Sequence, residues 1–208
     1  MSNALTTAAT AADGWTICSN RLKDIRDLGQ CGYLNLNGRR LLIHGGEQRF
    51  LDETGSLVKQ LQSTTDWIDL TGEFQRLMPD SKEMQHTVRN GRPLDELMWA
   101  CAWKQFDGEL LDGCRRDDVV SFNRWPNLSR LPHQGSTHRI VALLTQRPSS
   151  IVLASRLLRV PEADIAQVYC AAQRAGYAAP INRTVEEPVT KTHRHQSLIS
   201  RLMARLQR

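Results

Sequence analysis

The segment of residues 137–176 constrains the fold most, because it holds three apolar patterns of helical length separated by two short turns. Within each pattern the apolar residues recur every three or four positions, which is the spacing of one face of an α-helix. The spacing predicts helices over residues 137–146, 150–159 and 161–176, packed as a helix-turn-helix. The inner face of the third helix is expected to carry Ile165, Val168, Ala172 and Ala175.

Capping residues mark the ends of these helices. Ser149 or Ser150 can accept a backbone N–H at the start of the second helix. Pro161 suits the first turn of the third helix, and Gly176 can adopt the left-handed conformation that ends it. The apolar residues 177–181 that follow are expected to form a short strand.

The stretch ALLTQRPSSIVLASRLLRVPEADIAQVYCAAQRAGYA, from Ala142 to Ala178, resembles the winged-helix (helix-turn-helix) superfamily. The paired leucines of the first helix, the L-x-V-P turn and the final Ala-Gly carry the resemblance. The stretch is similar to MarR-like and ArsR-like regulators, and also to the helical end of bacterial PATAN-type signalling domains. The resemblance implies a winged-helix-like domain that contacts DNA in some of these families but need not in others.

The charges of the third predicted helix disfavour its binding to DNA. Its expected outward face is Glu162, Ala163, Ala166, Gln167, Cys170, Gln173 and Arg174, and Asp164 adds a second acid to the first turn. DNA affinity depends largely on cations that neutralise phosphates, so two leading acids favour contact with a protein. DNA binding remains the alternative, because Gln167 and Gln173 can pair with adenine and Arg156 and Arg159 can reach phosphates.

A β-hairpin is the clearest signal in the N-terminal half. Asn37-Gly38 is a preferred pair for a type I′ turn, in which both central residues have positive φ. Such a turn pairs Leu36 with Arg39 and Leu34 with Leu41. One face of the hairpin then carries Leu34, Leu36, Leu41 and Ile43. A hairpin with one apolar face is not stable alone, so this face must pack on another element.

Helices and short strands are expected after the hairpin. Ser81 can cap a helix that runs to Arg89. Pro93 can open another, with Asp95 and Glu96 in its first turn, where the helix dipole favours acids. Two short strands are expected at residues 110–111 and 119–122. Strands mixed with helices in this way indicate an α+β fold.

The segment of residues 125–133 contains two prolines and no periodicity, so the domain boundary is placed there. The expected organisation is a leader without fixed structure at residues 1–13, an α+β domain at 14–124, a winged-helix-like domain at 133–182, and a linker with a basic amphipathic tail at 183–208.

The tail concentrates the positive charge of the chain. Residues 191–208 contain five Lys and Arg residues and no acid, which equals the net charge of +5 of the whole chain. Leu198, Leu202 and Leu206 belong to an apolar stripe, whereas Arg201 and Arg205 belong to a basic one. The tail is expected to fold back on its own domain or to form a homodimer. Contact with an acidic partner, a nucleic-acid backbone or a membrane surface is the alternative.

Several protein classes are disfavoured by the sequence. The chain has neither a run of about 18 apolar residues nor a signal peptide, so we expect a cytoplasmic protein without stable membrane insertion. The five cysteines have no CxxC spacing, which indicates reduced thiols and no metal site. The P-loop, GxGxxG, GxSxG and HExxH motifs do not occur, and no cofactor or catalytic residue is expected.

Two clusters nevertheless suggest chemistry. Arg115 and Arg116 could bind a phosphate or a cyclic dinucleotide while Trp125 stacks on a base, although a solvated charged turn is the simpler interpretation. Ser136 lies near His133, but a helix-capping role explains Ser136 better than catalysis.

The sequence therefore predicts a non-enzymatic bacterial regulatory or signalling protein whose winged-helix-like domain binds mainly a protein partner. The alternative is a DNA-binding transcription regulator that uses the same domain and the basic tail. Candidate contact residues for either partner are Arg156, Arg159, Gln167, Gln173, Arg174, Arg201 and Arg205.

Overall fold

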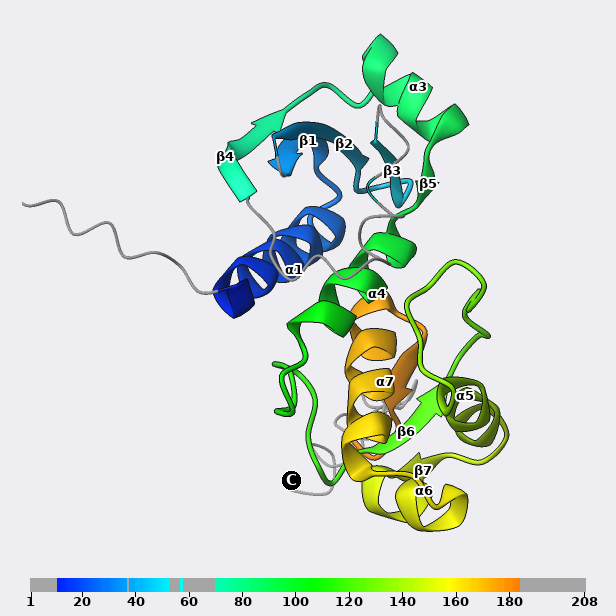
Figure 1. Ribbon diagram of the computed structural model, residues 1–208. Helices are drawn as coiled ribbons and strands as arrows, with labels where there is room; N and C mark the ends of the chain where they lie inside the picture. The colour runs from blue at the N-terminus through cyan, green and yellow to red at the C-terminus, as the bar shows by residue number, and fades with distance from the viewer. Residues whose placement is uncertain (1–10, 37, 53–56, 58–69, 184–208) are drawn as a thin grey trace, which may run out of the picture.

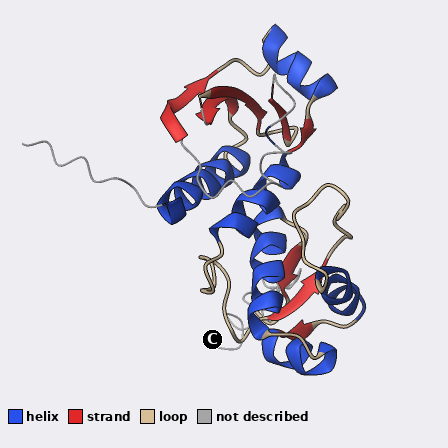
Figure 2. Cartoon of the chain, in the orientation of Figure 1, coloured by secondary structure: helices blue, strands red, loops and turns tan. Residues whose placement is uncertain are grey.

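The computed structural model describes residues 11–36, 38–52, 57 and 70–183. In this part of the chain six helices accompany a five-stranded and a three-stranded antiparallel sheet, which confirms the α+β class (Figures 1 and 2). The helices are α1 (Ala11–Asp27), α3 (Lys82–Asn90), α4 (Leu94–Gln105), α5 (Thr137–Gln146), α6 (Ile151–Leu158) and α7 (Glu162–Ala175). The strands are β1 (Cys31–Leu36), β2 (Arg39–His44), β3 (Arg49–Asp52), β4 (Leu70–Arg76), β5 (Arg92–Pro93), β6 (Val119–Phe122), β7 (Ser149–Ser150) and β8 (Ala178–Pro180).

The larger sheet has the strand order β4-β1-β2-β3-β5 and is built around the expected hairpin. Leu34 pairs with Leu41 and Leu36 with Arg39, so the predicted register is confirmed. Gly38 has a φ of +72°, the left-handed conformation that this turn requires. Asn37 lies outside the described residues.

Helix α1 covers the apolar face of the hairpin, and the sequence did not predict it. Its buried side chains, Trp15, Cys18, Leu22 and Ile25, recur at helical spacing and join the same core as Leu34 and Ile43. The expectation of a leader over residues 1–13 is wrong for its last three residues, because α1 begins at Ala11. The opposite face of the sheet packs Cys31 and Leu42 against Met84 of α3.

Helices α3 and α4 begin where the capping signals predicted. The Ser81 hydroxyl accepts a hydrogen bond from the Met84 backbone N–H at 3.3 Å, and Asp95 and Glu96 occupy the first turn of α4. Helix α4 is buried from Leu94 to Ala102 because α1 packs on one side of it and α7 on another (Figure 1). One hydrophobic core therefore runs through both halves of the molecule.

The smaller sheet has the order β7-β6-β8, with β6 in the centre. The predicted boundary at residues 125–133 would assign β6 to the N-terminal domain, but β6 pairs with two strands of the C-terminal half. Residues 110–111 form no strand, so that expectation is wrong. Residues 125–133 return to α4, where the Trp99 indole N–H donates to the Pro132 carbonyl at 3.0 Å.

The three predicted helices of the C-terminal half are confirmed as α5, α6 and α7 to within about a residue at each end. The Ser150 hydroxyl accepts from the Leu153 N–H and caps α6. Gly176, with a φ of +77°, ends α7. Among the described residues, no helix combines the length and the apolar character needed to cross a membrane.

Candidate partner-binding surface

Helix α7 is the most enclosed element of the C-terminal half. The expectation that Ala166, Cys170 and Arg174 face solvent is wrong, because all three are buried. Helix α4 and the turn of residues 111–114 occupy the side that was expected to be open. The Gln167 amide donates to the Trp103 carbonyl at 3.1 Å, and the Leu111 N–H donates to Cys170 Sγ at 3.4 Å.

The polar candidates on α7 are engaged within the protein. Gln167 accepts from the Gln134 amide at 2.9 Å, in addition to its bond to Trp103. The side chain of Gln173 lies against Gly113, and Arg174 donates to Asn20 Oδ1 at 3.1 Å. Base readout requires side chains that reach the edges of bases in a groove. Gln167, Gln173 and Arg174 do not form one exposed face of this kind.

Helix α6 instead exposes large apolar side chains. Leu153 and Leu157 are 47% and 49% exposed, whereas Ile151 and Ala154 on the other side of the helix are buried in the core. Leu153 and Leu157 are four positions apart, so they form one stripe along α6. In Figure 1, α6 lies at the end of the molecule farthest from the larger sheet.

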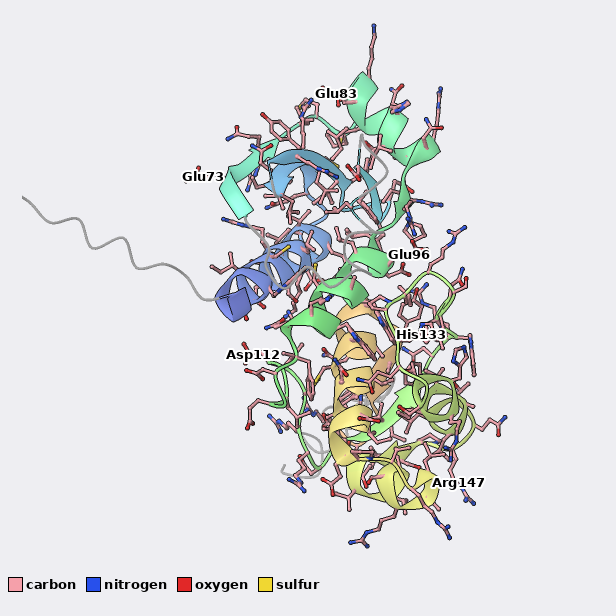
Figure 3. All side chains as sticks on the ribbon, viewed as in Figure 1. Glu73, Glu83, Glu96, Asp112, His133 and Arg147 are labelled. Atoms are coloured by element: carbon pink, nitrogen blue, oxygen red, sulfur yellow. The ribbon has the colours of Figure 1, made fainter. Side chains whose placement is uncertain are left out.

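Four arginines lie on α6 or near its ends. Residues 119–161 contain no Asp or Glu. Arg147, Arg156 and Arg159 are exposed, and Arg139 donates to the Leu158 carbonyl at 2.9 Å, which places it at the end of α6. Within the described residues, none of these four arginines forms an ion pair. Figure 3 labels Arg147 close to α6.

We call Leu153, Leu157, Arg139, Arg147, Arg156 and Arg159 the α6 surface. It combines exposed leucines with positive charge that the described part of the protein leaves without a carboxylate partner. Apolar area that is removed from water contributes about 25 cal/mol per Å², and charge of one sign favours association with the opposite sign. The surface can therefore bind an acidic partner that also offers apolar side chains.

Strand β6 separates the residues of the predicted phosphate or nucleotide site. Arg115 and Arg116 precede β6 and Trp125 follows it, so a strand of about 13 Å separates them. Arg116 forms an exposed ion pair with Glu162 at 2.7 Å. Trp125 is 52% exposed and lies beyond the other end of β6. Arg201 and Arg205 lie outside the described residues.

Ser136 and His133 do not form a nucleophile–base pair. Ser136 stands at the N-cap position of α5, but its side chain makes no capping hydrogen bond, so the expected capping role is wrong; its hydroxyl donates to Asp164 Oδ2 at 3.0 Å. The His133 ring nitrogen Nδ1 lies 2.9 Å from the Leu131 carbonyl. Both side chains thus bind groups other than each other.

A buried polar network positions α7, and sequence reasoning missed it. Asp118 is 1% exposed and accepts hydrogen bonds from the Tyr169 hydroxyl at 2.5 Å, the Arg115 N–H at 2.7 Å and Arg183 Nε at 2.6 Å. Antiparallel pairing of Val120 with Pro180 brings residues 118 and 183 together at one end of the sheet. That pairing is a long-range event which the local pattern does not encode.

The network shifts the titration of Asp118. Burial by itself raises the pKa of this carboxyl, but the hydrogen bonds from Tyr169, the Arg115 N–H and Arg183 outweigh burial. The pKa therefore lies below its ordinary value, and the carboxylate stays charged at neutral pH.

Two further buried acids are also neutralised. Asp95 accepts from Arg124 at 2.7 Å, and Glu96 accepts from Arg92 at 2.6 Å and from Arg130 at 3.4 Å. The ion pairs of Arg124 and Arg130 connect the segment after β6 to the start of α4. The two acids therefore do more than complement the helix dipole.

No ligand or family guides the assignment further. Among the described residues no three or more His, Cys, Asp or Glu side chains are grouped to hold a metal ion. Comparison with protein-family models, with curated proteins and with solved structures gives no match to this chain.

Proposed function

We propose that this protein is a non-enzymatic regulatory or signalling protein whose winged-helix-like C-terminal region binds an acidic segment of a protein partner. The observation that carries the proposal is the α6 surface, on which two exposed leucines lie among four arginines without a carboxylate partner in the described chain. The partner segment needs apolar side chains to cover Leu153 and Leu157. It also needs carboxylates to face the arginines.

A protein segment fits this surface better than DNA does. Phosphates would neutralise the arginines, but a DNA backbone would leave the two leucines without an apolar partner. Helix α7, which in helix-turn-helix proteins enters the major groove, is enclosed by α4 and the turn of residues 111–114. DNA binding is the second candidate, and the acid-free stretch of residues 119–161 is the feature that favours it.

The chain itself is a poorer occupant of the α6 surface. A second copy docked through this surface would bring the same four arginines into the interface, since a two-fold interface uses one patch twice. The tail would add Arg201 and Arg205, and residues 191–208 contain no acid. Like charges disfavour both contacts.

Fluorescence anisotropy with the full-length protein tests the proposal. The probe is a labelled helical peptide with leucines four positions apart and glutamates on either side of them. We expect binding that weakens about tenfold or more in the double variant Leu153→Ser, Leu157→Ser. Arg156→Glu with Arg159→Glu should weaken it too, and added salt should reduce the affinity of the wild type.

Matched controls distinguish binding at the α6 surface from nonspecific hydrophobic binding. Ile17→Ser with Leu28→Ser removes two other exposed apolar side chains and should leave binding unchanged. A peptide with serines in place of its leucines keeps the charge and should bind weakly. If the leucine variant binds the original peptide as tightly as the wild type does, the proposal is wrong. If a mixed-sequence DNA duplex binds more tightly than the peptide and ignores the leucine replacements, the DNA alternative is correct.

A further inference from the structure

A pair of thiols lies where the turn of residues 111–114 packs on the last turns of α7. The Leu111 N–H donates to Cys170 Sγ at 3.4 Å, and the Cys114 N–H donates to the Leu111 carbonyl at 2.9 Å. Leu111 therefore bridges the two residues, and Cys114 packs against the core cluster that contains Cys170. Cys170 is fully buried and Cys114 is half-buried, so the pair lies just beneath the surface.

A buried cation lies one helical turn from this pair. Arg174 is only 4% exposed and forms no ion pair with a described residue. Its Nε and Nη2 groups are buried without a hydrogen-bond partner in the described structure. Asp112, in the turn of residues 111–114, is exposed and appears in Figure 3 at the edge of the molecule. Burial lowers the pKa of Arg174 by more than Cys114 and Asp112 raise it, so this guanidinium favours further negative charge close to it.

The sulfur of Cys170 can supply that negative charge. The hydrogen bond from Cys114 lowers the pKa of Cys170 against the effect of burial, and the Leu111 N–H and Arg174 lower it further. The hydrogen bond to Cys170 and burial raise the pKa of Cys114, so Cys170 is the thiol of the pair that ionises more readily. The thiolate is the nucleophilic form of cysteine.

We propose that Cys170 and Cys114 are an oxidation site that hydroperoxides convert to a disulfide. The Cys170 thiolate attacks a peroxide oxygen, forms a sulfenic acid and releases hydroxide when the O–O bond breaks. The Cys114 sulfur then attacks the Cys170 sulfur, the S–S bond forms, and water leaves with the sulfenic oxygen and the thiol proton. A thiol reductant reverses the change by thiol–disulfide exchange.

Access to Cys170 requires the turn of residues 111–114 to open. The segment between α4 and β6, residues 106–118, contains neither helix nor strand. Its opening breaks the bonds from the Leu111 N–H to Cys170 Sγ and from Arg183 to the Gly113 carbonyl, but no helix or sheet. Oxidation that waits for such opening is slower than at an exposed thiolate.

A second thiol pair provides an internal reference. Cys18 on α1 and Cys101 on α4 have their sulfurs 3.8 Å apart, and both are completely buried. Burial and the contact with Cys18 raise the pKa of Cys101. Both cysteines lie within helices, where no irregular segment can open. We expect this pair to stay reduced under conditions that oxidise Cys114 and Cys170.

Peptide mapping of the full-length protein tests the site. The native protein is treated with a small excess of hydrogen peroxide, alkylated, digested with trypsin and analysed by mass spectrometry. We expect a disulfide between the peptides of residues 105–115 and 160–174 that disappears after reduction. The Cys114→Ser variant should trap a sulfenic acid on Cys170, which dimedone labels.

Two variants and the Cys18–Cys101 pair serve as controls for the cross-link between Cys114 and Cys170. Cys31→Ser, the matched control, should leave the cross-link unchanged, whereas Arg174→Met should slow its formation severalfold. The wild-type experiment needs no variant to fold. The proposal is overturned if wild-type protein gives no cross-link between Cys114 and Cys170, or if Cys18 and Cys101 oxidise as fast.

Discussion

Helices α6 and α7 are neighbours in the chain, yet one lies on the surface and the other in the core. Helix α6 has five Ile, Val or Leu residues among its eight, and only Ile151 and Ala154 are buried. Helix α7 begins with two acids in its first turn and has fewer large aliphatic residues, but nine of its 14 residues are buried. Apolar content therefore does not decide which helix occupies the centre.

Side-chain size explains the difference. Helix α7 carries Ala171, Ala172 and Ala175, which let α4 and the strands approach it closely from several sides. Helix α6 has large side chains around most of its circumference, so one face packs and another remains exposed. Surface leucines left over in this way indicate an interaction site when they cluster. The comparison teaches that a central helix is selected by what can surround it.

Introducing a carboxylate into each helix should give the largest difference between α6 and α7. Ile165→Asp puts an unpaired carboxylate in the core and should cost more than ~4 kcal/mol, enough to unfold the C-terminal region. Leu157→Asp on the exposed side of α6 should cost no more than about 0.5 kcal/mol. Thermal and urea unfolding measure both. Equal melting temperatures for the two variants would contradict the assigned faces.

Removing the buried charge that positions α7 should have the next largest effect. Asp118→Asn should lower the free energy of unfolding at neutral pH by about 1–3 kcal/mol, because Tyr169 and Arg183 lose a charged acceptor. Since the folded-state pKa of Asp118 is below its unfolded value, its contribution is present above about pH 4 and lost as the pH falls through the folded pKa. Urea unfolding should therefore show a smaller difference in free energy of unfolding between the wild type and Asp118→Asn at pH 3 than at pH 7. The same difference at both pH values would contradict a charged Asp118 in this network.

The ends of the two helices provide a smaller, matched test. Gly176 after α7 and Arg159 after α6 both have left-handed backbone, with φ of +77° and +55°. Gly176→Ala should destabilise the protein by about 1 kcal/mol, whereas Arg159→Gly should stabilise it by a few tenths to about 1 kcal/mol. The signs follow because only glycine adopts this conformation without steric cost. Chemical denaturation that gave the same sign for both replacements would contradict this explanation.

The smallest expected effect on stability is that of replacing the exposed leucines of α6, which we expect to contribute to binding and not to folding. Leu153→Ser with Leu157→Ser should lower the free energy of unfolding by no more than about 0.5 kcal/mol for each residue, because both side chains are half exposed to solvent. A loss above about 2 kcal/mol would mean that these leucines belong to the core, and it would remove the basis for the α6 surface.

The features that the sequence predicted correctly depend on neighbours along the chain. Positive φ at Gly38 determined the hairpin register, the Ser81 hydroxyl determined the start of α3, and Pro161 with Gly176 determined the limits of α7. Each signal acts over a few residues, where steric limits and capping hydrogen bonds are settled locally. The α+β class follows from the same local patterns.

The candidate site was only half predictable. Arg156 and Arg159 were expected to contact a partner and are exposed, but the apolar pattern of α6 did not distinguish the exposed Leu153 and Leu157 from the buried Ile151. Periodicity identifies the apolar positions of a helix and not how many of them the rest of the fold can cover. For the same reason, periodicity did not predict the burial of Arg174 or the proximity of Cys114 to Cys170.

By itself the sequence determined the local conformations: where the C-terminal helices and α3 begin and end, where α4 begins, and which residues of the hairpin face one another. Only the tertiary structure decided that β6 joins β7 and β8, that α7 lies between α4 and the smaller sheet, and that Asp118 meets Arg183. These outcomes depend on which distant surfaces fit together most closely. Close packing is a property of volumes in three dimensions, which the order of apolar and polar residues along the chain does not specify.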